Sequence, residues 1–248
     1  MPSRPLDRAM SVVRRPWVAP LAVVTVVFLA FALPPYLGLD PSRSRIPVPD
    51  GRPLYYPMLV AHIFLGTVAL LTACLQVWPW LRRRHPAVHR WSGRVYVFGG
   101  VLPAGVAVLF VAPFGALGPT QQAANTLLAV LWLLTTAAGY RAARQRRFAA
   151  HREWMVRSFA LSFSIVANRL WMVVCMAVFT PEALTGGSPD PAVFAQALGV
   201  SAWLSWVVNL LVAEWWLQRT RSRGRAQRRD ARIRRAGGPV PAESARPA

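Results

Sequence analysis

Apolar residues occur along this chain in six long runs separated by short polar connections. Each run is close to the ~20 residues that an α-helix needs to cross the ~30 Å hydrocarbon core of a bilayer. The pattern predicts spans over residues 17–36, 55–80, 95–117, 121–140, 158–180 and 200–218. We therefore expect an all-α integral membrane protein. A six-span domain over 17–218 would lie between tails 1–16 and 219–248.

Composition supports a membrane protein. Hydrophobic residues make up 54% of the chain and charged residues 15%, whereas charged residues approach ~25% in soluble domains. The mean hydropathy is +0.33. The net charge of +20 falls in the connections between apolar runs rather than along one folded surface. For that reason we do not expect nucleic-acid binding.

Arginines alternate between the two sides of the expected bundle. Four arginines precede residue 17, five lie within 82–94, six within 141–157 and ten after 218. The opposite loops carry only Arg43, Arg45 and Arg52. By the positive-inside rule, both termini are expected in the cytoplasm. We expect the Arg-rich tail 219–248 to be disordered and to contact anionic lipid headgroups, at about 1 kcal/mol for each arginine.

The first apolar run has a second interpretation. Ala30-Phe31-Ala32 resembles a signal-peptide cleavage site, and Arg14 and Arg15 precede the run. However, the run exceeds the usual ~7–15 residues of a signal core, and Pro34-Pro35 follows it. We therefore expect a retained span.

A basic phrase occurs twice, each time between two apolar runs. It reads RRHPAVHRW from Arg83 and RRFAAHREW from Arg146. The recurrence predicts two parallel-repeat hairpins in the helical bundle, formed by spans two and three and by spans four and five, and related by an axis along the membrane normal. Chance recurrence in an Arg-rich chain is the alternative.

The two phrases predict a polar cluster at the cytoplasmic face. Its members are His85, His89, Arg90, His151 and Arg152. The three histidines could form an open metal site, although HPAVH lacks the acidic residue of a metallopeptidase helix. Alternatively, two of them could ligate a single haem, with arginines on its propionates. Histidines at the headgroup level also occur simply as amphipathic interface residues.

Ionisable residues inside a span cost at least ~2.5 kcal/mol on insertion scales. Three occur here: His62, Arg169 and Glu214. Counted from the expected interfaces, His62, Arg169 and Asn209 share one layer in the outer half of the membrane. We expect a ligand-binding layer in which Arg169 attracts an anionic or electron-rich group. The alternative is an arginine satisfied by carbonyls between packed helices.

Helical spacing suggests a connection between the two groups of residues. Provided that span five is one continuous helix, a single face joins the cytoplasmic histidine to the buried arginine. The face consists of His151, Met155, Ser158, Ser162, Ile165 and Arg169. In span three, Gly99, Gly100 and Pro103 predict close helix approach and a kink near the proline.

Several of these motifs together resemble an uncharacterised bacterial family of predicted membrane proteins, domain of unknown function 2306. The resemblance covers about residues 55–218. It depends on H-x3-G at His62, Gln76, HRWSGRVY from His89, HREWMVRSFAL from His151, Arg169, and WLSWVVNLLVAE ending at Glu214. It implies a multi-span membrane protein and supplies no reaction. We expect the protein to be a multi-pass protein of the bacterial plasma membrane.

Three functional hypotheses follow. The chain contains no nucleophile triad, phosphate loop or dinucleotide fingerprint, so an enzymatic activity is not expected. The leading hypothesis is binding or transport of a small anionic or amphipathic molecule through the intramembrane layer. The alternatives are a membrane redox protein with one haem at the cytoplasmic face, and an assembly or scaffold protein.

Overall fold

The structure is a computed structural model that describes residues 17–235. Its α-helices are α2 (Val18–Ala32), α3 (Pro34–Leu37), α4 (Tyr55–Gln76), α5 (Pro79–Arg84), α6 (Pro86–Arg94), α7 (Leu102–Leu109), α8 (Pro119–Arg144), α9 (Phe148–Ser162), α10 (Ser164–Phe179) and α11 (Pro191–Arg235). A π-helix, η2 (Val95–Val101), joins α6 to α7. Short 3-10 turns lie in the connections, namely η1 (Pro41–Arg43), η3 (Ala112–Phe114) and η4 (Pro181–Leu184). Within the described range there is no strand, as the sequence predicted.

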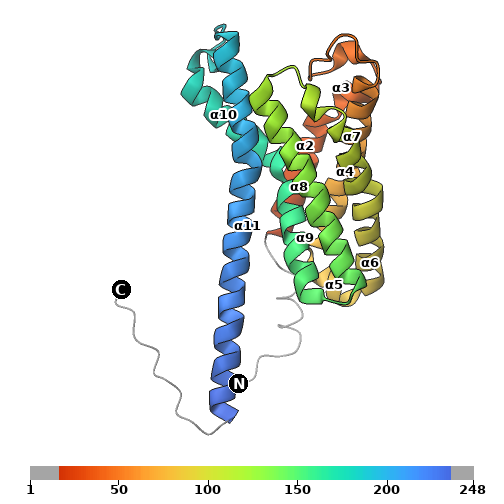
Figure 1. Cartoon of the computed structure of the whole chain (residues 1–248), viewed down its shortest axis with the longest axis vertical. Helices are drawn as coiled ribbons and strands as arrows, with labels where there is room; N and C mark the ends of the chain where they lie inside the picture. The colour runs from red at the N-terminus through yellow and green to blue at the C-terminus, as the bar shows by residue number, and fades with distance from the viewer. Residues whose placement is uncertain (1–16, 236–248) are drawn as a thin grey trace, which may run out of the picture. The chain divides into compact units, whose positions relative to one another are not determined.

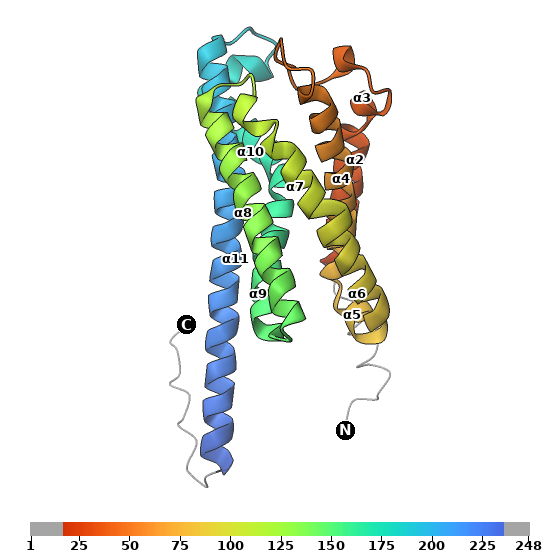
Figure 2. The same cartoon turned by 45° about the vertical axis from the view of Figure 1, so that its right-hand side comes forward.

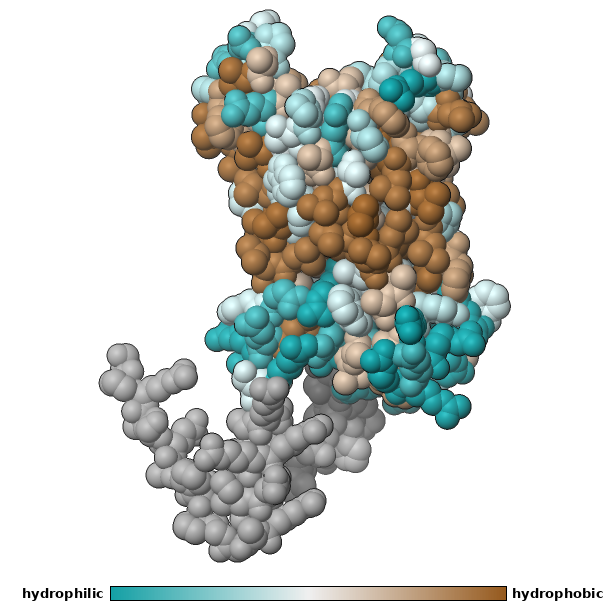
Figure 3. Space-filling view, in the orientation of Figure 1, coloured by the Kyte–Doolittle hydropathy of each residue, from teal (hydrophilic) through white to brown (hydrophobic). Residues whose placement is uncertain are grey.

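Four helical stretches are long and apolar enough to cross a bilayer. They are Tyr55–Gln76, Pro86–Phe114, Pro119–Arg144 and Pro191–Arg223. The pair α9 and α10 is a fifth candidate, bent by 44°. Figure 3 shows apolar side chains as a band across one face, with hydrophilic side chains towards both ends. The described residues thus support a multi-pass membrane protein with four or five spans.

The expected first span is shorter than predicted. Helix α2 has 15 residues and ends at Ala32, just before Pro34 and Pro35. A proline cannot donate to the carbonyl four residues before it, and its ring crowds that carbonyl. The apolar run therefore breaks into α2 and α3 and does not form one helix over 17–36.

Two helix pairs form the centre of the bundle. In both Figure 1 and Figure 2, α8 lies beside α9, and α4 lies beside α7. Gly100 of η2 packs so closely on α4 that an added Cβ would lie 2.9 Å from the Cα of Ala69. The irregularity expected near Pro103 takes the form of this π-helix, whose wide turns end just before the proline.

The repeated phrase occupies corresponding places in the two hairpins. We call the end of the bundle with the α5–α6 and α8–α9 connections the basic end. There Gln76 Nε2 donates to the carbonyl of His89 at 2.9 Å, and His151 Nδ1 lies 2.9 Å from the carbonyl of Gly139. Each phrase is thus tied to the preceding helix of its own hairpin. Duplication and orientation in the membrane stay predictions.

Helix α11 spans two compact units, which divide at Leu210 and Leu211. In the first unit, Asp190 caps the helix, because its Oδ1 accepts from the amides of Ala192 at 2.7 Å and Val193 at 3.3 Å. In the second unit the helix continues to Arg235. Residues 219–235 are therefore helical, contrary to the disorder expected there, because arginine, alanine and glutamine are good helix formers. The tails 1–16 and 236–248 lie outside the described residues.

Candidate functional site

A cluster of buried hydroxyl groups joins η2, α8 and α9. The hydroxyl of Tyr96, a residue only 2% exposed, lies 2.6 Å from Ser158 Oγ and 2.8 Å from Ser162 Oγ. Trp132 Nε1 donates to Ser162 Oγ at 2.8 Å, and Thr136 Oγ1 lies 2.6 Å from Ser158 Oγ. These buried groups satisfy one another without a ligand, so the cluster serves packing and specificity. The sequence prediction missed Tyr96, Trp132 and Thr136 as members.

His62 contacts the helices next to this hydroxyl cluster. Its Nδ1 lies 3.0 Å from the carbonyl of Ala104, and its ring meets the edge of Trp132 with 6.5 Å between centroids. A carbonyl oxygen only accepts, so Nδ1 carries the proton and Nε2 of the neutral ring remains an acceptor. His62 therefore bonds to α7, and no hydrogen bond among the described residues joins it to Arg169.

Asn209 lies at a different level from Arg169. Asn209 Nδ2 donates to the carbonyl of Ala160 at 3.1 Å, and Asn168 Nδ2 donates to Ser201 Oγ at 3.3 Å. These two contacts set the register of α11 against α9 and α10. Asn209 is level with Ala160, nine residues before Arg169, or about 13 Å along the helices.

The expectation of a shared layer is thus wrong for Asn209. The helices that carry Asn209 and Arg169 begin at Pro191 and Phe148, rather than at the expected residues 200 and 158. Both residues therefore lie farther along their helices than the count assumed. The two helices run in opposite directions. Correcting both starting points therefore moves Asn209 and Arg169 towards opposite ends of the bundle.

Span five is broken at Phe163, between α9 and α10. The face expected to connect His151 with Arg169 is therefore interrupted, since it required a continuous helix. Carbonyl groups at the break find other donors. Ser164 Oγ donates to the carbonyl of Leu161 at 2.6 Å, and Asn209 donates to that of Ala160. Asn209 thus has a structural role at the break.

Arg169 lies beyond the break, in the second turn of α10. Its side chain is half-buried, and its Nε atom is buried without a hydrogen-bond partner. Its Cζ lies 6.0 Å from the ring centroid of Phe28 in α2. No carboxylate in the described part of the chain pairs with it. A buried donor without an acceptor is costly, and more so when it carries charge.

Arg45 approaches the same region from the loop after α3. Its charge and the phenol of Tyr36 are close enough to act on Arg169. Arg45 Nη1 donates to the carbonyl of Phe31 at 2.9 Å, and Cζ lies 4.1 Å above the Phe31 ring. Pro35 leaves that carbonyl without its helical donor, so Arg45 replaces the missing bond. The loop guanidinium is thereby held near Arg169.

The acidic residue of this loop is engaged elsewhere. The hydroxyl and the amide of Ser42 donate to Asp40 Oδ1 at 2.8 and 2.9 Å. These bonds, with the nearby charge of Arg43, lower the pKa of the Asp40 carboxyl below its usual value. Asp40 thus stays ionised in its own turn and does not neutralise Arg45 or Arg169.

Trp206 supplies a second buried donor without an acceptor. The residue is 6% exposed, and its Nε1 atom has no partner. It precedes Asn209 by three residues, so the register of α11 puts it level with Phe163 at the break. Trp206 and Arg169 thus leave two buried N–H donors unsatisfied, one at the break and one beyond it.

Comparison with known families places this site within a recognised family. The model of a family described as "Predicted membrane protein (DUF2306)" matches residues 59–217. The chain belongs to this family. The match confirms the resemblance inferred from sequence and covers His62, Arg169 and Asn209, whereas Phe28 and Arg45 precede it. No curated protein and no solved structure matches the chain.

At the basic end, the DUF2306 protein does not gather its three histidines into one group. His85 is exposed and meets the edge of Trp80, with 5.0 Å between centroids. His151 Nδ1 is engaged with Gly139, and His89 Nδ1 is buried without a partner. The described residues contain no group of three or more histidine, cysteine or acidic side chains suited to a metal ion. The two arginines of the expected cluster, Arg90 and Arg152, are exposed.

Proposed function

We propose that this protein binds an anionic amphipathic molecule within the membrane and that Arg169 holds its negative group. The observation that carries the proposal is the buried Nε of Arg169, which has no hydrogen-bond acceptor. In hydrocarbon, arginines are rare and pair with other groups or mark pathways for substrates. A carboxylate or phosphate at this position would supply the missing acceptor and neutralise the charge.

Nearby features also favour a negative ligand. In the first turn of α10 the amides of Val166 and Ala167 donate to the carbonyl of Phe163 at 3.2 and 3.1 Å, and the aligned peptide dipoles give this end of the helix partial positive charge. The unpartnered indole N–H of Trp206 lies level with the break that precedes α10. Arg45 adds a second guanidinium, whose charge acts on Arg169. Broken helices whose N-termini point at anionic groups are typical of transporters. Transport of the bound molecule is therefore part of the proposal.

The structural alternative is less well supported. If Arg169 only stabilised helix packing, we would expect its N–H groups to donate to backbone carbonyl groups. Asn209 makes such a bond, because its side chain donates to the carbonyl of Ala160 at the break. The haem and scaffold alternatives stay predictions, and no contact of His89 or His151 favours a haem over packing. We also propose the topology that the arginine pattern predicts. In it both termini are cytoplasmic, the membrane is the bacterial plasma membrane, and Arg169 lies in the outer half.

The proposal is tested with cis-parinaric acid, a fluorescent fatty acid with one carboxylate. Its fluorescence is titrated with the purified full-length protein in neutral detergent. We expect saturable binding of the acid and much weaker binding of its methyl ester, which lacks the charge. Replacing Arg169 by methionine removes a charge-assisted bond. That change should weaken binding of the acid roughly 10- to 100-fold.

Arg52 provides the matched control. It is an exposed arginine on the same side, with its Cζ 3.6 Å above the ring of Phe114. Arg52→Gln should leave affinity for the acid unchanged, because it removes the same formal charge away from the site. Equal affinities of wild type and Arg169→Met would refute the proposal, as would equal binding of acid and ester.

A further inference from the structure

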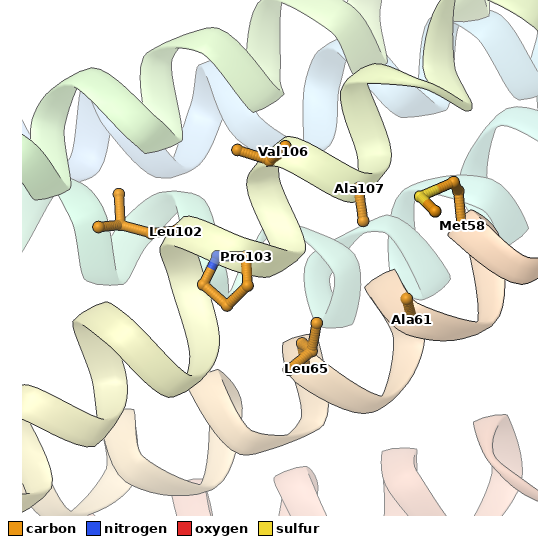
Figure 4. Close-up of a pocket in the computed structure, with 7 residues that line it drawn as sticks. All are labelled: Met58, Ala61, Leu65, Leu102, Pro103, Val106 and Ala107. Carbon is orange, nitrogen blue, oxygen red and sulfur yellow. The ribbon is translucent and has the colours of Figure 1, made fainter.

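An apolar groove opens between α4 and α7, on the side of α4 next to His62. Figure 4 shows its lining, which consists of Met58, Ala61, Leu65, Leu102, Pro103, Val106 and Ala107. Its volume is about 520 Å³, within the range of ~300–1,000 Å³ typical of ligand pockets. All seven side chains are apolar, so the groove offers hydrocarbon contact and no hydrogen bond.

The groove has a local structural cause. Ala61 and Ala107 are too small to fill the space between the two helices, and Pro103 has no amide hydrogen to continue a regular helix after the π-turns. Behind the groove, the bond from His62 Nδ1 to the carbonyl of Ala104 ties α4 to α7. The hollow is therefore built into a fixed helix pair.

The position of the groove indicates what fills it. Both helices belong to candidate membrane spans. Ala61 and Leu65 lie about 9 and 15 Å along α4 from its first residue, well inside a hydrocarbon core of ~30 Å. Val106 is 51% exposed, so the groove opens outward from the bundle. At this depth the surrounding medium is lipid hydrocarbon.

We propose that the groove is a specific binding site for one hydrocarbon chain of a membrane lipid. A transmembrane helix is a poorer occupant, because the lining on α4 covers only Met58 to Leu65, about 10 Å of helix axis. A flexible chain conforms to so short a hollow and makes more van der Waals contacts there than on a convex helix face. The inference does not depend on the anion site at Arg169.

Photo-crosslinking tests this proposal. The full-length protein is placed in nanodiscs containing a phosphatidylcholine with a diazirine in its acyl chain, and labelled residues are mapped by mass spectrometry. We expect labels on Met58 and Val106 in excess of those on Leu170 and Val178. The latter two are exposed α10 residues, at 67% and 70%, that report ordinary boundary lipid.

Filling the groove should remove the excess. In Ala61→Leu and Ala107→Leu, labelling of the groove should fall to the level of the α10 positions, because the larger side chain fills the hollow and removes its van der Waals contacts with the lipid chain. Val174→Leu on α10 is the control and should change nothing. If a leucine variant melts well below wild type, Ala107→Val is used. Labelling of the groove equal to that of α10, or insensitive to these variants, would mean boundary lipid only. Absence of lipid label at Met58 and Val106, the result expected if a protein segment covers the groove, would likewise overturn the proposal.

Discussion

Replacing Gly100 by alanine should lower the melting temperature of the purified protein by roughly 2–12 °C. The new Cβ would lie 2.9 Å from both Cα and Cβ of Ala69 and 3.0 Å from its backbone nitrogen. A backbone contact cannot be relieved by a rotamer change, so α4 and η2 must separate. Overpacking of this kind costs about 1–3 kcal/mol, and in a chain of this size each kcal/mol shifts the midpoint by ~2–4 °C.

Gly66 provides the matched control on the helix that Gly100 contacts. A Cβ added at Gly66 meets no atom within 4 Å. Gly66→Ala should therefore leave the melting temperature unchanged or raise it, because alanine is the better helix former by ~1 kcal/mol. Scanning fluorimetry of both variants checks the pair. Equal melting temperatures would show that the contact between η2 and α4 is not tight in the folded protein.

Tyr96→Phe should lower the melting temperature to a similar extent, although it removes only one oxygen. The Tyr96 hydroxyl contacts both Ser158 and Ser162, and all three residues are buried. Its loss leaves the two buried serine hydroxyls with one partner fewer. Removing one member of a buried pair costs about 1–3 kcal/mol.

Tyr140→Phe is the control for the hydroxyl cluster. Within residues 17–223 the Tyr140 hydroxyl accepts a single hydrogen bond, from the exposed Arg144 at 3.3 Å. Tyr140→Phe should therefore shift the melting temperature by much less than Tyr96→Phe does. Equal shifts in the two variants would contradict a stabilising role for the cluster.

Much of the fold could be predicted from the sequence. The length of the apolar runs predicted the helices α4, α8 and α11, although α11 begins at Pro191, nine residues before the expected start. The insertion cost of an ionisable residue directed attention to Arg169, which the structure leaves with a buried, unpartnered Nε. These predictions depend on local chemistry, so a single chain contains enough information for them.

Other features depend on contacts between helices. Nothing in Ser162-Phe163-Ser164 resembles a helix stop, because it contains neither glycine nor proline, and the break was therefore missed. Depths counted along the chain failed for Asn209, since only the pairing with Ala160 fixes its level. The hydroxyl cluster escaped notice because serine and threonine are common in membrane helices and do not single out Tyr96.

The central claim is that Arg169 serves a ligand rather than the fold. The direct measurement is the melting temperature of wild type and Arg169→Met, each without and with cis-parinaric acid. Without the acid, the variant should melt at or above the wild-type temperature, because a buried guanidinium without an acceptor destabilises the unliganded protein. The acid should stabilise only the wild type, since a ligand raises stability only where it binds. A variant that melts several degrees lower without the acid, and is stabilised by it as much as the wild type, would contradict the claim.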